Sequence, residues 1–112
     1  PYECALRELR EESGLRAGAL TLRGVVTETS PREDWQWMLF LYLAEEITGE
    51  LVGDEREGLF RWWPLADLYS VQMPEADVIF SPYVLDRSRP FFDARFHYDA
   101  DLRLAERIIH SG

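Results

Sequence analysis

Three glutamates near the start of the chain have the spacing that brings side chains to one face of a helix. Glu11 and Glu12 follow Glu8 by three and four residues, and residues so spaced are neighbours on a helical surface. Carboxylates placed in this way repel one another unless a cation lies between them. Because hard divalent cations prefer oxygen ligands, the spacing predicts a metal-binding helix.

The helix that would carry these glutamates is predicted over residues 2–12. Ala5, Leu6 and Leu9 would face a core, and Gly14 would end the helix in a left-handed conformation. The alternative is an acidic helix face that only contacts solvent, which is the usual fate of a Glu-rich helix.

Residues 7–15, Arg-Glu-Leu-Arg-Glu-Glu-Ser-Gly-Leu, resemble the core of the Nudix box. In that core Arg-Glu, an aliphatic residue, any residue, Glu-Glu, any residue, glycine and an aliphatic residue follow in order, and the chain meets every fixed position. The resemblance implies a Nudix hydrolase, in which the residues matching Glu8, Glu11 and Glu12 bind metal or act as the catalytic base. We expect Arg7 to be a structural partner for a box carboxylate.

The full Nudix box begins further upstream, with a glycine loop and an earlier glutamate that would fall before Pro1. Family members also carry one or more strands ahead of the box. We therefore expect the chain to be an N-terminally incomplete Nudix domain.

The size and composition of the chain indicate one globular domain over residues 1–112, since 46% of the residues are hydrophobic. The resemblance implies an α/β fold, a Nudix-type α/β/α sandwich built on a mixed β-sheet, with its N-terminal strands absent from this chain.

Two strands are predicted after the first helix, over residues 20–29 and 36–44. The run from Trp37 to Leu43 is apolar throughout, which indicates a central strand buried on both faces. A further short strand is predicted over residues 59–63, closed by Pro64.

The C-terminal half is predicted to contain two helices and a hairpin. The helices cover residues 65–68 and 75–85, although the second contains Pro82. Alternating apolar residues on both sides of Asp99-Ala100-Asp101 predict a β-hairpin.

The formal net charge of −9 argues against duplex nucleic acid as a partner, because such binding depends on Lys and Arg that neutralise phosphates. The longest apolar run is too short to cross a bilayer, so we expect no membrane association and a cytoplasmic location. A nucleotide substrate is compatible with the charge, because a bound divalent cation inverts the local potential. We expect Mg²⁺ as the cofactor, with Mn²⁺ as the alternative.

A fourth metal ligand is expected far along the chain. Nudix proteins often add an acid from a loop just before a strand that carries tryptophan, and Glu57 has this position ahead of Trp62. We favour Glu57 over Glu55; the alternative for both is a charge on a solvated loop.

Residues 73–82, with Phe91-Phe92 and Phe96-His97-Tyr98, resemble the C-terminal part of MutT-type 8-oxo-dGTP diphosphatases. The resemblance implies that Asp77 faces the edge of a purine, and Trp35 beside the polar loop is the aromatic residue we expect to contact the base. The alternatives are an acid in the first turn of a helix and an aromatic residue packed in the core.

The sequence thus predicts a Mg²⁺-dependent Nudix hydrolase that cleaves a nucleoside triphosphate, such as 8-oxo-dGTP, to the monophosphate and pyrophosphate. The Nudix box acts on the phosphate groups of the substrate and does not identify the chemical group attached to them. Alternatives are an enzyme for ADP-ribose or a dinucleoside polyphosphate, and a non-catalytic nucleotide-binding or regulatory module. Nudix proteins of this size often form homodimers, but no feature of the chain specifies an interface.

Overall fold

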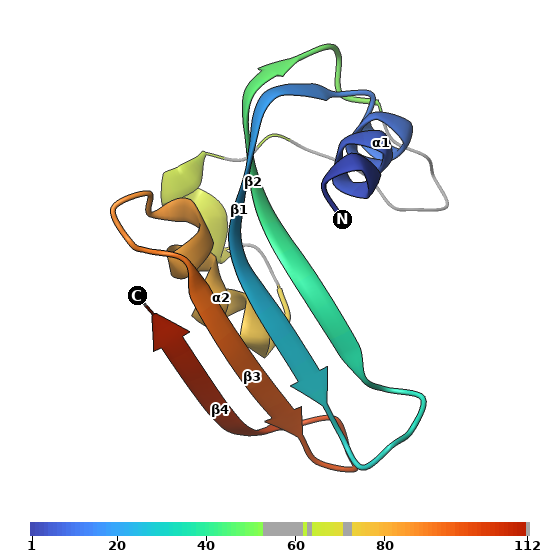
Figure 1. Cartoon of the computed structure of the whole chain (residues 1–112), viewed down its shortest axis with the longest axis vertical. Coiled ribbons are helices and arrows are strands. Elements are labelled where there is room, and N and C mark those ends of the chain that lie inside the picture. The colour runs from blue at the N-terminus through green and yellow to red at the C-terminus, as the bar shows by residue number, and fades with distance from the viewer. Residues whose placement is uncertain (53–61, 63, 71–72, 112) are drawn as a thin grey trace. The chain divides into compact units, whose positions relative to one another are not determined.

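The chain adopts an α/β fold, as the sequence predicts (Figure 1). The structure, a computed structural model, describes residues 1–52, 62, 64–70 and 73–111. Its elements in chain order are α1 (Tyr2–Ser13), β1 (Arg16–Thr29), β2 (Trp37–Thr48), the 3₁₀-helix η1 (Leu65–Ser70), α2 (Glu75–Leu85), β3 (Phe92–Tyr98) and β4 (Leu104–Ser111).

The four strands form one sheet in the order β2-β1-β3-β4. β1 and β3 are parallel, with a register that runs from Gly24↔Phe92 to Thr29↔His97. β3 and β4 are antiparallel. The predicted mixed sheet is therefore confirmed.

The chain divides into two compact units. One contains Pro1–Thr21 and Ala44–Val71, and the other contains Leu22–Leu43 and Gln72–Gly112. We call them the N-terminal unit and the C-terminal unit. α1 and η1 belong to the N-terminal unit, α2, β3 and β4 belong to the C-terminal unit, and β1 and β2 contribute residues to both.

Helix α1 ends where the sequence predicts, at a glycine. Gly14 has φ of 76°, and its N–H donates to the Arg10 carbonyl oxygen at 2.9 Å. Two features exclude a side chain at this position. The left-handed conformation is strained for residues other than glycine, and a Cβ atom would lie 2.8 Å from the Glu50 carbonyl oxygen. The box glycine thus turns the chain out of α1 toward β1.

The core of the C-terminal unit lies between α2 and the sheet. Alternate residues of β3 are buried, namely Phe92, Ala94, Phe96 and Tyr98. The α2 residue Phe80 packs against Phe96 with ring centroids 6.2 Å apart. This alternation fixes which face of each strand is apolar.

The prediction that the apolar strand is central and buried on both faces is wrong. Among the described residues, β2 lies at one edge of the sheet, and Met38 and Phe40 are 61% and 42% exposed. Leu39 and Leu41 pack against the core instead. The run is buried on one face only, so its continuous apolar character does not report two-sided burial.

The C-terminal elements agree with the sequence. Helix α2 covers Glu75–Leu85 with Pro82 inside it, η1 replaces the expected short helix, and β3 and β4 form the expected hairpin. The strand predicted over residues 59–63 lies outside the described residues apart from Trp62. None of the described helices is long and apolar enough to span a membrane.

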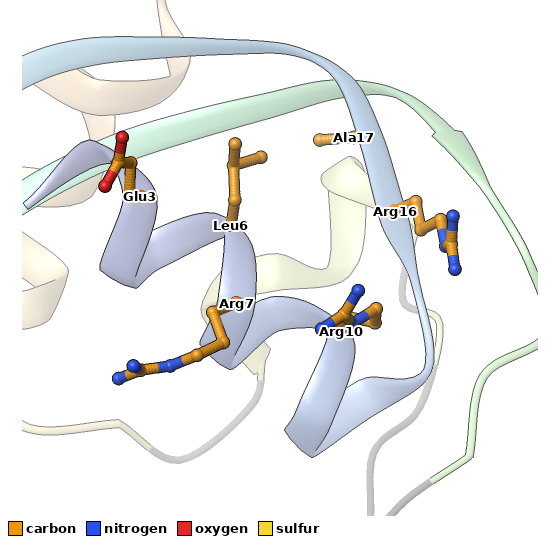
Figure 2. Close-up of a pocket in the computed structure, with 6 residues that line it drawn as sticks. All are labelled: Glu3, Leu6, Arg7, Arg10, Arg16 and Ala17. Atoms are coloured by element: carbon orange, nitrogen blue, oxygen red, sulfur yellow. The ribbon is translucent and has the colours of Figure 1, made fainter.

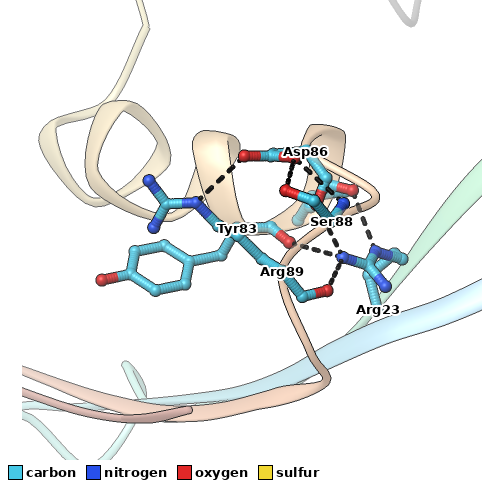
Figure 3. Close-up of polar contacts among 6 residues, drawn as sticks. Arg23, Tyr83, Asp86, Ser88 and Arg89 are labelled. Atoms are coloured by element: carbon cyan, nitrogen blue, oxygen red, sulfur yellow. Dashed lines mark hydrogen bonds and ion pairs between the residues drawn. The ribbon is translucent and has the colours of Figure 1, made fainter. Parts of the chain in front are cut away.

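Arg23 connects β1 to the end of α2 (Figure 3). Its Nε donates to the Val84 carbonyl oxygen at 3.1 Å, and Nη2 lies 2.9 and 2.6 Å from the carbonyl oxygens of Asp86 and Arg89. The last carbonyls of a helix have no partner within the helix, so a guanidinium there satisfies them and complements the helix dipole. We call this arrangement the Arg23 clamp.

Replacing Arg23 with alanine should destabilise the C-terminal unit. Loss of charge-assisted hydrogen bonds to half-buried carbonyl groups is expected to lower the free energy of unfolding by about 1 to 3 kcal/mol. Urea denaturation followed by circular dichroism measures the change. The control is Arg107→Ala at an exposed position of β4; equal losses in the two variants would show that the clamp contributes nothing beyond an ordinary surface arginine.

Candidate functional site

The glutamates predicted to bind metal lie on an exposed face of α1. Glu8, Glu11 and Glu12 are all exposed. The Arg7 guanidinium Nε lies 3.8 Å from Glu11 Oε1, and the Cys4 thiol lies 3.5 Å from Glu8 Oε1. Because both partners of the Arg7–Glu11 pair are more than half exposed, this contact stabilises the helix only slightly.

The carboxylates of this face are not gathered around one point. Among the described residues, no three Asp, Glu, His or Cys side chains are grouped closely enough to hold a metal ion. The donor chemistry nonetheless fits a hard divalent cation, since three exposed carboxylates on adjacent helical turns offer only oxygen ligands. Glu57, the expected fourth ligand, lies outside the described residues.

A pocket of about 380 Å³ borders a different side of α1, next to the start of β1. Its lining residues are Glu3, Leu6, Arg7, Arg10, Arg16 and Ala17. The three guanidinium groups point in different directions and do not converge on a common position (Figure 2). The pocket therefore lacks the arrangement that would bind a phosphate group between them.

Both residues predicted to contact a base lie in the C-terminal unit. Trp35 packs edge-on against Tyr98 with ring centroids 4.7 Å apart, and it also meets the exposed ring of Trp37 at 5.7 Å. Asp77 lies in the first turn of α2, and its charge acts on Tyr98. An aromatic cluster and a carboxyl group are thus found in one neighbourhood.

The loop between β1 and β2 holds Trp35 in place. Ser30 is buried, and its hydroxyl accepts from the Arg32 N–H at 3.1 Å. The same hydroxyl lies 3.0 Å from the Trp35 carbonyl oxygen, while the Trp35 N–H donates to the Arg32 carbonyl oxygen at 3.1 Å. These bonds close a tight loop, so Trp35 has a fixed backbone position.

Glu28 is the residue of this neighbourhood that sequence reasoning missed. It is only 8% exposed and sits on β1 opposite Phe96 of β3. It shares its strand face with Gly24 and Val26, which are also buried. The signal was available in the sequence, because a two-residue period that places Val26 in the core places Glu28 there too.

Burial raises the pKa of the Glu28 carboxyl group, and the negative charge of Asp77 raises it further. Burial likewise raises the pKa of Asp77. The pKa of Tyr98 is raised to about 12 by burial and then by the charges of Glu28, Asp77 and Glu75. Tyr98 therefore remains a neutral phenol. The two neighbouring acids, Glu28 and Asp77, release their protons at a higher pH than free carboxyl groups do.

Comparison with known families matches most of the chain to one model. The model described as NUDIX domain matches residues 1–87. The match extends well beyond residues 7–15, which carried the resemblance in the sequence.

Two relatives agree with this match. An uncharacterized Nudix hydrolase of Bacillus subtilis (strain 168), YvcI, is 31% identical over 78 residues, which cover 67% of this chain and 49% of that protein. The crystal structure of a mutator MutT protein from Bacillus halodurans superimposes with a TM-score of 0.81 at 27% identity, covering 96% of this chain and 72% of that one. The match to the Bacillus subtilis protein YvcI spans about half of that protein's length.

The raised pKa of Glu28 should appear in the pH dependence of stability. A carboxyl group whose pKa is raised in the fold keeps its proton after the unfolded chain has released it. The free energy of unfolding therefore falls as the pH rises from the ordinary value of 4.5 through the raised pKa. Glu28→Gln should remove this fall and be more stable than the parent at neutral pH.

Urea denaturation at several pH values between the acid and neutral ranges measures this difference. The matched control is Glu106→Gln at an exposed position of β4, which should follow the parent protein. A constant difference between parent and Glu28→Gln at every pH would contradict the assignment.

Proposed function

Because the chain belongs to the Nudix hydrolase family, we propose that it hydrolyses a phosphoanhydride bond of a nucleoside triphosphate and releases pyrophosphate. The single observation that carries the proposal is the exposed glutamate face of α1. Glu8, Glu11 and Glu12 stand there in the order and spacing of the Nudix box, on a helix ended by the box glycine.

The glutamate face would supply the ligands for Mg²⁺, with Glu57 as an additional ligand and Mn²⁺ as an alternative ion. A bound divalent cation would neutralise the negative charge that develops on the phosphoryl oxygens and the leaving group in the transition state. One glutamate of the face accepts the proton of the attacking water. A helix positions these groups more rigidly than a loop would. Arg7 orients Glu11 through the contact at 3.8 Å.

The C-terminal unit would recognise the base. Asp77 and the cluster of Trp35 and Tyr98 combine a carboxyl group with aromatic rings, and these are the chemical groups that bind a purine by hydrogen bonds and stacking. We favour an oxidised purine such as that of 8-oxo-dGTP as the substrate, acted on in the cytoplasm. The resemblance of residues 73–82 to MutT-type enzymes supports this choice.

Replacing Glu11 or Glu12 with glutamine should abolish Mg²⁺-dependent pyrophosphate release from 8-oxo-dGTP. We expect a loss of at least about a hundredfold, the scale of groups that stabilise charge in a transition state. A coupled assay for pyrophosphate measures it, and circular dichroism checks that the fold is kept. Glu3→Gln on another side of the same helix is the control and should retain activity.

A panel that includes ADP-ribose and a dinucleoside polyphosphate identifies the substrate class by its products. Turnover unchanged in both glutamine variants would refute the metal assignment. Absence of turnover on every substrate would favour a non-catalytic nucleotide-binding module.

Replacing Asp77 with asparagine should change the preference among bases and leave the Mg²⁺ dependence unchanged. Because an amide presents a different set of donors and acceptors, the ratio of kcat/KM for 8-oxo-dGTP to that for dATP should shift by about tenfold or more. Steady-state kinetics on both nucleotides over a range of Mg²⁺ concentrations measures the two effects separately. Equal losses on every nucleotide would count against a base-reading role.

A further inference from the structure

The C-terminal end of α1 is held by residues 49–52, the segment that follows β2. We propose that this segment positions the carboxylates of Glu11 and Glu12 for metal binding, and that Gly49 is a positioning residue of the metal site. The inference rests on the proposed function, because it concerns the ligands of that enzyme's metal ion.

Helix α1 needs support at this end. Glu11 and Glu12 lie in its last turn, and the helix ends at Ser13. The last turn of a helix frays readily, because its carbonyl groups have no partner within the helix. Within α1, which the structure describes over its whole length, only Ser13 is buried. Fixed positions for two of the three expected ligands therefore require contacts that hold Ser13.

Backbone contacts supply this support. The Val52 N–H donates to the Ser13 carbonyl oxygen at 2.7 Å, which satisfies one of the carbonyl groups left free at the helix end. The Ser13 hydroxyl accepts from the Leu15 N–H at 3.2 Å and donates to the Leu9 carbonyl oxygen. The last turn is thereby joined both to its own helix and to the 49–52 segment.

Two glycines allow the segment to lie against the helix end. Gly49 has φ of 96°, a positive value that favours glycine. A Cβ atom at Gly49 would lie 2.8 Å from the Gly14 carbonyl oxygen, and one at Gly14 would lie 2.8 Å from the Glu50 carbonyl oxygen. Both glycines belong to the N-terminal unit. The two turns therefore approach each other too closely for a side chain on either glycine.

A side chain at residue 49 would separate the segment from the helix end. The change removes none of the three glutamates, but the last turn of α1 loses outside contacts and samples more conformations. Groups that orient metal ligands without touching the ion contribute about ten- to hundredfold to metal affinity. A substitution of Gly49 should therefore weaken metal binding although every ligand is still present.

Mn²⁺ binding without nucleotide, followed by the electron paramagnetic resonance signal of the free ion, tests the inference. The dissociation constant should rise by about tenfold or more in Gly49→Ala. Gly18→Ala is the matched control, because its added Cβ atom would meet Glu46 in the same unit, 2.8 Å from Cβ, rather than the end of α1. This control should bind Mn²⁺ like the parent even where its stability falls.

A second pair of variants keeps the test decisive if Gly49→Ala does not fold. Val52→Pro removes the N–H that donates to Ser13, whereas Val52→Ala keeps it. The proline variant should weaken Mn²⁺ binding by about tenfold or more, and the alanine variant should match the parent. Hydrogen exchange followed by mass spectrometry should be faster in the last turn of α1 only in the variants that bind Mn²⁺ weakly.

Activity separates the inference from the proposed function. With 8-oxo-dGTP, Gly49→Ala should need a higher Mg²⁺ concentration for half-maximal pyrophosphate release, and saturating Mg²⁺ should restore most of kcat. If Mn²⁺ binding follows the expected pattern but no triphosphate releases pyrophosphate, the proposed function fails and the inference stands. If pyrophosphate is released but Gly49→Ala binds Mn²⁺ like Gly18→Ala, or if the parent does not bind Mn²⁺, the inference is overturned.

Discussion

Both candidate sites depend on how negative charge is compensated in solvent and in the interior. On α1, the side chains of Glu8, Glu11 and Glu12 are exposed to solvent, and like charges at helical spacing repel one another, which favours the approach of a cation. Within the C-terminal unit, Glu28 is buried beside acidic neighbours. Solvation is poorer there, so a retained proton is the more favourable form of compensation. Carboxyl groups of this chain therefore occupy two different environments, one exposed on α1 and one buried on β1.

Local signals in the sequence were sufficient for several elements. Gly14 ends α1 because the required left-handed conformation and the nearby carbonyl oxygen of Glu50 leave room only for glycine. The hairpin of β3 and β4 follows from the two-residue period and from Asp99, whose carboxylate accepts from the N–H groups of Asp101 and Arg103 at 2.9 and 3.0 Å. Such features are settled within a few residues, so pattern and turn chemistry predict them well.

Features that depend on the order of strands were not predictable in this way. The apolar run of β2 indicates burial on two faces, yet Met38 and Phe40 are exposed. Whether a strand lies inside a sheet or at its edge depends on pairing between distant segments, and the run itself does not contain that information. Glu28 was missed for a different reason: the two-residue period of β1 assigns it to the core, but its polar side chain argues for the surface, and in the structure the period prevails.

Glu28 and Asp77 lie on two regular elements, β1 and α2, which the Arg23 clamp connects. Strand β1 carries both Glu28 and Arg23, and the Arg23 clamp holds carbonyl groups at the end of α2, the helix whose first turn carries Asp77. Parallel pairing with β3 fixes the position of Glu28 from the other side. Side chains carried by regular elements have less freedom than side chains on loops. The Arg23 clamp therefore limits the movement of α2 relative to β1.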